Sequence, residues 1–259
     1  MTLVACTADE RAKSQSLKKY LQNKFGFLDV GLNKKFGVII VCGGDGTMLH
    51  TIHKYMHLKI PFYGINTGNL GFLMNNEESI KSHNFSNFFS NSLKEIEIHP
   101  LHMKVTLSDG EEKQAIAINE VSVLRSTHQT AHIKILVNGK TQMQKLISDG
   151  LLLSTPAGSS AYNLSAGGPI IPLKSNILSL TPISPFRPRR WKGALLNENA
   201  VVEFVSLEKS RPINAVADFN DFTDVRKVEI KIQKNNYVKL LFNENTSLED
   251  RIVTEQFLA

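Results

Sequence analysis

A glycine-rich turn between two apolar segments is the feature that most constrains the fold of this chain. Residues 36–42 (FGVIIVC) are β-branched or apolar, as in a strand buried within a parallel sheet. The turn itself is residues 43–47 (GGDGT), and the apolar residues after it, over 48–56, have the spacing of one helix face. A strand, a glycine turn and a helix start present backbone N–H groups and the positive end of a helix dipole to an anion. The sequence therefore predicts an α/β domain with a phosphate site at this turn.

Asp45 is the unusual residue of this turn, because a carboxylate repels phosphate unless it binds a metal ion or accepts a proton. The glycines around it lack Cβ and let a phosphate chain lie against the backbone. We therefore interpret Asp45 as a catalytic residue and the rest of the turn as a phosphate-binding turn. A simpler alternative is that Asp45 caps the next helix, since Gly and Asp are common in ordinary turns. The residues assigned to the phosphate turn are Gly43, Gly44, Gly46 and Thr47.

The first part of the chain alternates between predicted strands and predicted helices, which is typical of a parallel α/β sheet. Apolar runs at residues 3–6 and 60–65 indicate further strands. Residues 7–10 (TADE) predict a capping box at the start of a helix, and Phe85–Leu93 predict an amphipathic helix.

The hydrophobic period falls to two after residue 98, as in antiparallel strands. Residues 133–137 run into Asn138-Gly139, a strong hairpin signal, and residues 228–232 and 238–242 flank another turn. The residues from Ser247 onward return to helical spacing. The predicted domains are an α/β domain with a parallel sheet over 1–98, a mostly antiparallel, β-sandwich-like domain over 99–244, and a helix over 245–259 that packs back on the first domain.

The charge of the chain, +6 with a pI near 9.2, raises the question of a nucleic-acid partner. Its lysines are scattered and no aromatic residues are interleaved with them, so we expect no nucleic-acid binding. One dense basic segment, Arg187–Lys192, is interpreted as a solvated loop, as a site that attracts a polyanionic small molecule, or as a subunit contact.

Hydrophobic residues make up 42% of the chain, but no apolar run approaches the roughly 18 residues of a membrane span. We therefore expect no membrane association. Cys6 and Cys42 are the two cysteines, and both lie in apolar runs, which favours a reducing cytoplasm over a disulfide scaffold.

Four further segments carry residues suited to ligand binding. Residues 66–73 (NTGNLGFL) follow a predicted strand, where open α/β sheets bind ligands. Asn119-Glu120 can hold vicinal hydroxyls such as those of a ribose, although this pair alone is a weak signal. Residues 148–150 (SDG) come next, and residues 155–169 (TPAGSSAYNLSAGGP) place small residues around Tyr162, which can border a flat base. The alternative for this last segment is a glycine-rich crossover loop.

Together these segments resemble the NAD kinase family over nearly the whole chain. The matching motifs are GGDGTML, NTGNLGFL, the Asn-Glu pair, SDG and TPAGSSAYNLSAGGPI. Diacylglycerol kinases, sphingosine kinases and phosphofructokinases carry turns similar to the first motif, so the last motif supplies most of the specificity. Residues 180–191 (LTPISPFRPRRW) resemble the bacterial branch of the family, in particular its alphaproteobacterial members.

The resemblance implies ATP-dependent phosphorylation of the adenosine ribose 2′-hydroxyl of NAD, with Mg²⁺ arriving on ATP rather than in a dedicated protein site. It implies NAD bound between two domains and a homo-oligomer whose sites are completed by a neighbouring subunit. Asp45 matches the proton acceptor, and Asn119 and Glu120 match the pair that holds ribose hydroxyls. The NAD-binding positions that the resemblance implies are Asp45, Gly46, His50, Phe72, Asn119, Glu120, Asp149, Ala157, Ser160, Ala161, Tyr162, Asn163, Leu164, Ser165 and Ser184.

Two departures from the family pattern concern residues of this site. Ser160 stands where the family more often has Thr, which keeps the hydroxyl. Asp218-Phe219-Asn220 stands where many members read Asp-Gly-Gln, so a contact from this loop does not carry over. Two other functions remain open from the sequence: a lipid kinase that shares the glycine turn, and a catalytically silent NAD(P)-binding sensor.

Overall fold

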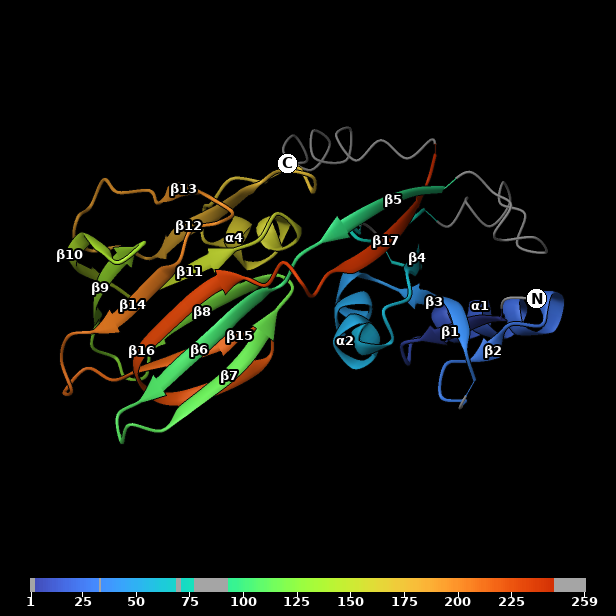
Figure 1. The fold of residues 1–259 in the computed structure, drawn as a ribbon, viewed down its shortest axis with the longest axis horizontal. Helices are drawn as coiled ribbons and strands as arrows, with labels where there is room; N and C mark the ends of the chain where they lie inside the picture. The colour runs from blue at the N-terminus through green and yellow to red at the C-terminus, as the bar shows by residue number, and fades with distance from the viewer. Residues whose placement is uncertain (1–2, 33, 69–70, 77–92, 245–259) are drawn as a thin grey trace. The chain divides into compact units, whose positions relative to one another are not determined.

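The structure of this protein, a computed structural model, divides into two compact domains. The first comprises residues 1–98 with 237–259, and the second comprises residues 99–236. Figure 1 shows both, coloured along the chain. The residues that the structure describes are 3–32, 34–68, 71–76 and 93–244.

The first domain contains a six-stranded sheet in the order β2-β1-β3-β4-β17-β5. The strands from β2 through β17 pair in parallel, and β5 closes the sheet as an antiparallel edge strand. β3 is buried along most of its length, which explains its continuous apolar sequence. The strands are β1 (Leu3–Ala8), β2 (Leu28–Asp29), β3 (Phe36–Gly43), β4 (Phe62–Asn66), β5 (Leu93–Ile98) and β17 (Val238–Asn243).

The helices of this domain connect its parallel strands. Helix α1 (Ala12–Phe25) follows β1, and its Leu21 packs with Cys6 and Ile40 of the sheet. Helix α2 (Asp45–Tyr55) follows β3 and continues into a short 3₁₀ helix, η1 (Met56–Leu58). Both helices begin where a parallel strand ends, so their N-termini lie at the ligand-binding edge of the sheet.

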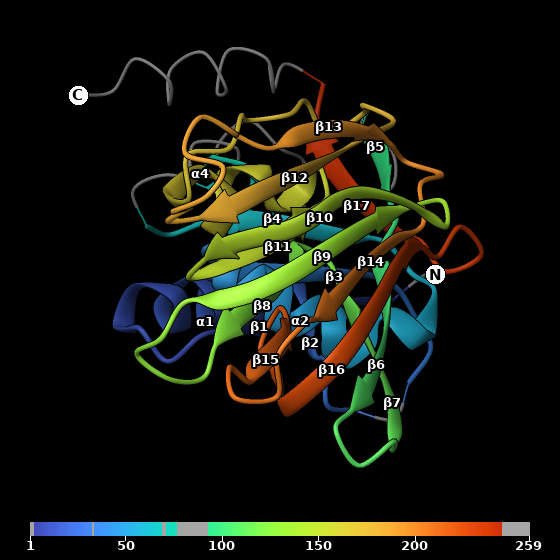
Figure 2. The same cartoon turned by 90° about the vertical axis from the view of Figure 1, so that its left-hand side faces the viewer.

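The second domain is built on an 11-stranded antiparallel sheet that curls around an apolar core. Its main path is β10-β9-β14-β16-β15-β8-β11-β12-β13, and β6 joins β16 to β7. Figure 2 shows β9, β14 and β16 side by side. The strands are β6 (Leu101–Leu107), β7 (Glu112–Ala117), β8 (Glu120–Arg125), β9 (Ala131–Val137), β10 (Lys140–Ser148), β11 (Gly150–Ser154), β12 (Ile177–Ile183), β13 (Ala194–Asn197), β14 (Val202–Ser206), β15 (Ile213–Ala217) and β16 (Asn220–Ile232).

Two short helical turns follow β11 in the second domain. They are the 3₁₀ helix η3 (Ala157–Ser160) and helix α4 (Tyr162–Ser165). The core beneath the sheet includes Val121, Val123, Leu151 and Phe204, which come from alternating positions of their strands.

The predicted fold class is confirmed: one domain has a parallel-containing sheet, and the other has a curled antiparallel sheet. Two local predictions, for residues 238–242 and for TADE, differ from the structure. The strand over 238–242 does not form a hairpin with 228–232, because it leaves the second domain and pairs with β4 and β5 as β17. Residues 7–8 still belong to β1, and α1 begins only at Ala12, so TADE is not a capping box.

The last residue of the predicted helix over Phe85–Leu93 belongs to a strand, because Leu93 begins β5. The residues of this predicted helix up to 92, and the predicted helix over 245–259, lie outside the described residues. In the part of the chain that is described, every helix is too short or too polar to cross a membrane.

Candidate active site

The glycine turn of residues 43–46 joins β3 to α2 in the first domain. Gly43 has no room for a side chain, because an added Cβ would lie 2.4 Å from the Thr47 Oγ1 atom. Gly44 is the extended residue that precedes α2, and its N–H group donates to Thr47 Oγ1 at 3.4 Å. Gly46 is exposed, and an added Cβ there would meet no atom of the described residues within 4 Å. The turn therefore leaves open space at the first turn of a helix, where the dipole favours an anion.

Asp45 is the first residue of α2, and its carboxylate points to the loop that follows β4. The Phe72 N–H donates to Asp45 Oδ2 at 2.8 Å, and the Leu73 N–H donates to Asp45 Oδ1 at 2.9 Å. Gly71 keeps this loop close, since a Cβ there would lie 3.1 Å from Asp45 Oδ1. The position of Asp45 disfavours the alternative in which it caps α2, because Gly44 occupies the cap and the carboxylate bonds outside the helix. The two N–H groups fix the orientation of the carboxylate.

Asp9 supports the same turn from the end of β1. The Thr47 hydroxyl donates to Asp9 Oδ2 at 2.8 Å, and the Arg11 guanidinium donates to the same oxygen from Nη2 at 2.6 Å. Arg11 also reaches Thr67 Oγ1, after β4, at 3.4 Å. Burial alone raises the pKa of Asp9, but hydrogen bonds from Arg11, Ser14 and Thr47 outweigh it and hold that pKa well below its usual range.

Sequence reasoning missed both Asp9 and Arg11. A usable signal existed, because Asp9 is the first charged residue after a predicted parallel strand, and such positions share one edge of the sheet. The strand order, which places β1 beside β3, was the missing information.

Replacing Asp9 with Asn is expected to lower the free energy of unfolding at pH 7 by about 1–2 kcal/mol, since bonds to a charged acceptor are lost. Because the folded-state pKa of Asp9 is depressed, its stabilisation is present above the unfolded-state value near 4 and disappears as the pH falls below it. Denaturant unfolding at several pH values checks this. The control Glu10→Gln changes an exposed neighbouring carboxylate and should leave stability unchanged. A difference between Asp9→Asn and wild type that does not shrink as the pH falls from 5 toward 2 would contradict the account.

Asn119 and Glu120 lie at the start of β8 in the second domain. Asn119 Oδ1 and Glu120 Oε2 are buried and have no hydrogen-bond partner among the described residues. Burial raises the pKa of Glu120 to about 7, and the charge of Asp218 adds to the effect. Two unpartnered buried acceptors side by side are suited to a ligand that carries hydroxyl donors, because an unmade buried hydrogen bond is costly.

The segment that begins at Thr155 packs on the backbone of this pair. The Thr155 N–H donates to the Asn119 carbonyl oxygen at 2.9 Å, and the Thr155 hydroxyl donates to the Ile118 carbonyl oxygen at 2.7 Å. Gly158 touches the Asn119 backbone, since an added Cβ would lie 2.3 Å from the Asn119 oxygen. Burial first, and then the charges of Glu120 and Asp149, raise the pKa of the half-exposed Tyr162 hydroxyl. The structure thus brings the Asn119-Glu120 pair and the Tyr162 segment together, although the two are separate motifs in the sequence.

Asn163 was predicted to contact NAD, and in the structure its side chain bonds to other residues of the second domain. Its Nδ2 donates to the Ser159 and Pro169 carbonyl oxygens at 3.2 and 2.9 Å, and the Thr181 hydroxyl donates to its Oδ1 at 2.7 Å. The side chain is fully buried, so its hydrogen-bonding groups hold the segment together rather than facing a ligand. The other predicted residues of the segment differ in exposure: Ala157 is buried, Ser160, Ala161 and Leu164 are half-buried, and Ser165 is exposed.

Asp149 and Ser184 lie close in the second domain. The Arg125 Nε atom donates to Asp149 Oδ1 at 2.6 Å, and the Asp149 N–H donates to the Ile183 carbonyl oxygen at 3.0 Å. Ser184 is exposed and has a left-handed backbone, with φ of 48°. Sequence reasoning missed Arg125, because its pairing with Asp149 depends on the antiparallel register of β8 and β11.

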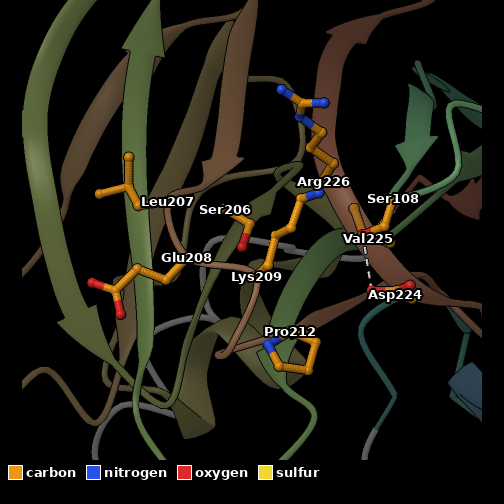
Figure 3. A pocket seen from close by; sticks show the side chains of 9 residues that line it. All are labelled: Ser108, Ser206, Leu207, Glu208, Lys209, Pro212, Asp224, Val225 and Arg226. Carbon is orange, nitrogen blue, oxygen red and sulfur yellow. Dashed lines mark hydrogen bonds between the residues drawn. The ribbon is translucent and has the colours of Figure 1, made fainter.

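His50 is exposed on α2. The cavity in Figure 3, of about 180 Å³, is lined by residues of the second domain such as Glu208, Lys209 and Arg226, none of them predicted for the site. Among the described residues, no three His, Cys, Asp or Glu side chains form a group that could hold a metal ion.

Comparison with protein families decides which reaction this chemistry belongs to. Residues 5–83 match the ATP-NAD kinase N-terminal domain, and residues 118–241 match the ATP-NAD kinase C-terminal domain. The chain belongs to the NAD kinase family.

Similar curated NAD kinases come from Rickettsia and fit the alphaproteobacterial branch that residues 180–191 indicated. The NAD kinase of Rickettsia prowazekii (strain Madrid E) is 54% identical over 85% of this chain and 85% of that protein. The NAD kinase of Rickettsia bellii (strain OSU 85-389) is 48% identical over 99% of this chain and 98% of that protein.

Two solved NAD kinase structures share the fold. Yeast NADH kinase complexed with NADH has a TM-score of 0.82 and 18% identity, and the match covers 98% of this chain and 87% of that one. An NAD kinase from Archaeoglobus fulgidus in complex with ATP has a TM-score of 0.71 and 22% identity over 98% and 96%. The glycine turn and Asp45 lie within the match to the N-terminal NAD kinase domain. Asn119, Glu120 and Tyr162 lie within the match to the C-terminal domain.

Proposed function

We propose that Asp45 accepts the proton of the adenosine ribose 2′-hydroxyl of NAD while ATP supplies the phosphoryl group. ATP-dependent conversion of NAD to NADP is the reaction of the NAD kinase family, to which the chain belongs. The observation that carries the role of Asp45 is its carboxylate, oriented by the Phe72 and Leu73 N–H groups at the start of α2, beside the open position at Gly46.

A carboxylate is too weak a base to deprotonate a ribose hydroxyl in advance. It need not do so, because the transition state of phosphoryl transfer is loose and the nucleophile loses its proton late. Asp45 then orients the hydroxyl and takes the proton as the new bond forms. The Gly44 and Gly46 turn leaves the phosphates free to approach the first turn of α2, where charge developing on them is stabilised.

Asn119 and Glu120 are the proposed grip on the ribose of NAD. Their buried, unpartnered oxygens, Asn119 Oδ1 and Glu120 Oε2, match hydroxyl donors. Tyr162 is exposed near Glu120 and has the flat apolar face that borders an adenine. Mg²⁺ is part of the ATP substrate, where it offsets the charge of the phosphates.

A substrate panel tests this function. Purified protein is incubated with ATP and Mg²⁺ together with NAD, with NADH, or with diacylglycerol vesicles, and inorganic polyphosphate replaces ATP in a parallel series. The proposal expects NADP from NAD and no vesicle binding. A phosphorylated lipid product would identify the lipid-kinase alternative, and tight NAD binding without turnover would identify the sensor.

The oligomer is a second part of the proposal. The family resemblance assigns Asp45 and Asn119 to one chain and the region of Asp149 and Ser184 to a neighbour, and it makes the basic segment Arg187–Lys192 a subunit contact. Light scattering of the purified protein distinguishes a monomer from a dimer or tetramer.

Asp45→Asn and Asp149→Ala are each expected to abolish most activity, and co-expressed as mixed oligomers they are expected to restore part of it. In a mixed pair one site carries both changes and the other carries neither. NADP formation by tagged, co-purified hetero-oligomers measures the rescue. If subunit exchange is verified and no activity returns, each site is built from one chain and Asp149 acts only on its own subunit, through Arg125.

A cytoplasmic location belongs to the proposal as well. It is supported by Cys6 and Cys42, which are both free and buried. Burial raises the pKa of the Cys6 thiol to about 11, so this cysteine is an unreactive core residue rather than a disulfide partner.

A further inference from the structure

Asp218 lies in the tight turn between β15 and β16 and binds the backbone of the ribose pair. Its Oδ2 accepts the Ile118 N–H at 2.7 Å, and its Oδ1 accepts the Asn119 N–H at 2.9 Å and the Glu120 N–H at 3.3 Å. One carboxylate thus receives three successive backbone donors from a segment about 100 residues earlier in the chain. Bonds to an ionised acceptor are stronger than neutral ones.

The contact also runs in the opposite direction. The Asp218 N–H donates to the Glu120 carbonyl oxygen at 3.1 Å. Asp218 has a φ of 54°, a left-handed conformation that Asp and Asn adopt more readily than most residues. The turn is therefore strained for most side chains, yet Asp218 bonds to Glu120 through both its backbone and its side chain. This arrangement fixes where the unpartnered Asn119 and Glu120 oxygens point.

The charge of Asp218 acts on Glu120 as well. Glu120 is half-buried with its Oε2 atom buried, and the charge of Asp218, from the β15–β16 turn, acts on it. The charges of Glu120 and Asp149 in turn act on the Tyr162 hydroxyl. Among the described residues, the causes that raise the pKa of Glu120 are burial first and then the negative charge of Asp218.

We infer that Asp218 is the positioning residue for the ribose grip of Asn119 and Glu120, and that its charge moves the pH dependence of NAD affinity through Glu120 to higher pH. This inference rests on the proposed function, in which these two residues hold the ribose. Asp218 itself touches the backbone of the pair and needs no contact with NAD.

The sign of the pH dependence follows from the ionisation of Glu120. The pKa of Glu120 is raised to about 7, first by burial and then by Asp218. Above that pH the ionised carboxylate accepts hydroxyl donors, and below it the protonated group loses an acceptor. NAD affinity is therefore expected to rise between pH 6 and pH 8, with a midpoint near 7.

Asp218→Asn tests the inference, because Asn keeps the size and the left-handed backbone but removes the charge and one acceptor oxygen. At pH 8 the Kd and KM for NAD should rise about tenfold to a hundredfold while kcat changes less than about threefold. The midpoint of the pH dependence should move to lower pH, since the repelling charge is gone. Calorimetry with NAD at several pH values gives the affinities without requiring turnover.

The matched control is Asp221→Asn, which makes the same change at an exposed position three residues along the same hairpin. It should leave NAD affinity and its pH midpoint as in wild type. Glu120→Gln is the second test, since the pH dependence should disappear in that variant whether or not Asp218→Asn folds.

The inference is overturned if folded Asp218→Asn binds NAD as wild type does at pH 8 with the same midpoint, or if Glu120→Gln keeps the wild-type pH profile. These outcomes differ from a failure of the proposed function. A wild-type protein that binds NAD with this pH profile but makes no NADP would refute the function and leave the role of Asp218 intact.

Discussion

Asp45→Asn is expected to lower kcat for NADP formation by about 10²–10⁴, the usual contribution of a general base, while NAD still binds. The amide has the shape of the carboxylate but cannot take up the hydroxyl proton. It can still accept one of the backbone N–H groups of Phe72 and Leu73, so the loop after β4 should stay close to its wild-type position.

Steady-state kinetics with calorimetry of NAD binding measures this prediction. Asp109→Asn is a suitable control, because Asp109 also accepts a backbone N–H, from Glu111 at 2.8 Å, but lies in an exposed hairpin turn of the second domain. The control should keep wild-type turnover. Near-normal kcat in Asp45→Asn would show that Asp45 orients its loop and takes no proton from the substrate.

Gly158→Ala is expected to damage both stability and NAD binding. The added methyl group would lie 2.3 to 2.5 Å from the backbone O, C and Cα atoms of Asn119, and backbone atoms cannot rotate away as a flexible side chain can. Overpacking of this kind costs about 1–3 kcal/mol or more. Because the relief must come from movement of Asn119, the KM for NAD should rise at least about tenfold as well.

Thermal unfolding and NAD titration of Gly158→Ala check this result. Gly31→Ala is the control, since its added methyl group would meet only the Asp29 carboxylate, at 3.3 Å, in an exposed turn. It should melt and bind NAD as wild type does. A Gly158→Ala protein with unchanged melting temperature and KM would contradict the packing of the Thr155 segment on Asn119.

The parts of the fold that sequence predicted well are those with a local cause. The β3 strand and α2 follow from an apolar run, a glycine turn and helical spacing, which are all contained in residues 36–56. The hairpin at Asn138-Gly139 likewise follows from its two turn residues. β17 was misassigned because its alternating pattern fits either domain, and only its pairing with β4 and β5 decides between them.

The residues of the candidate site also divide into those with a local sequence signal and those that depend on strand order or register. Asp45 was recognisable because its chemistry conflicts with the turn that contains it. Arg125 and Asp218 carry no such local signal, and Asp9 shows only its place after a predicted strand, since each acts on a segment that strand order or register brings to it. Asn163 shows the reverse case. It lies within a predicted ligand-binding motif, but its side-chain amide makes three hydrogen bonds to other residues of the chain. Residues that position others are therefore visible only in the structure.

The most direct measurement follows both products of the reaction with purified wild-type protein, NAD, ATP and Mg²⁺. NADP is quantified with an NADP-specific dehydrogenase, which requires the phosphate on the adenosine ribose 2′-hydroxyl, and ADP is quantified in the same sample. The account predicts equal amounts of NADP and ADP, with both reduced by about 10² or more in Asp45→Asn. ADP released without NADP, or NADP formed equally fast by Asp45→Asn, would contradict it.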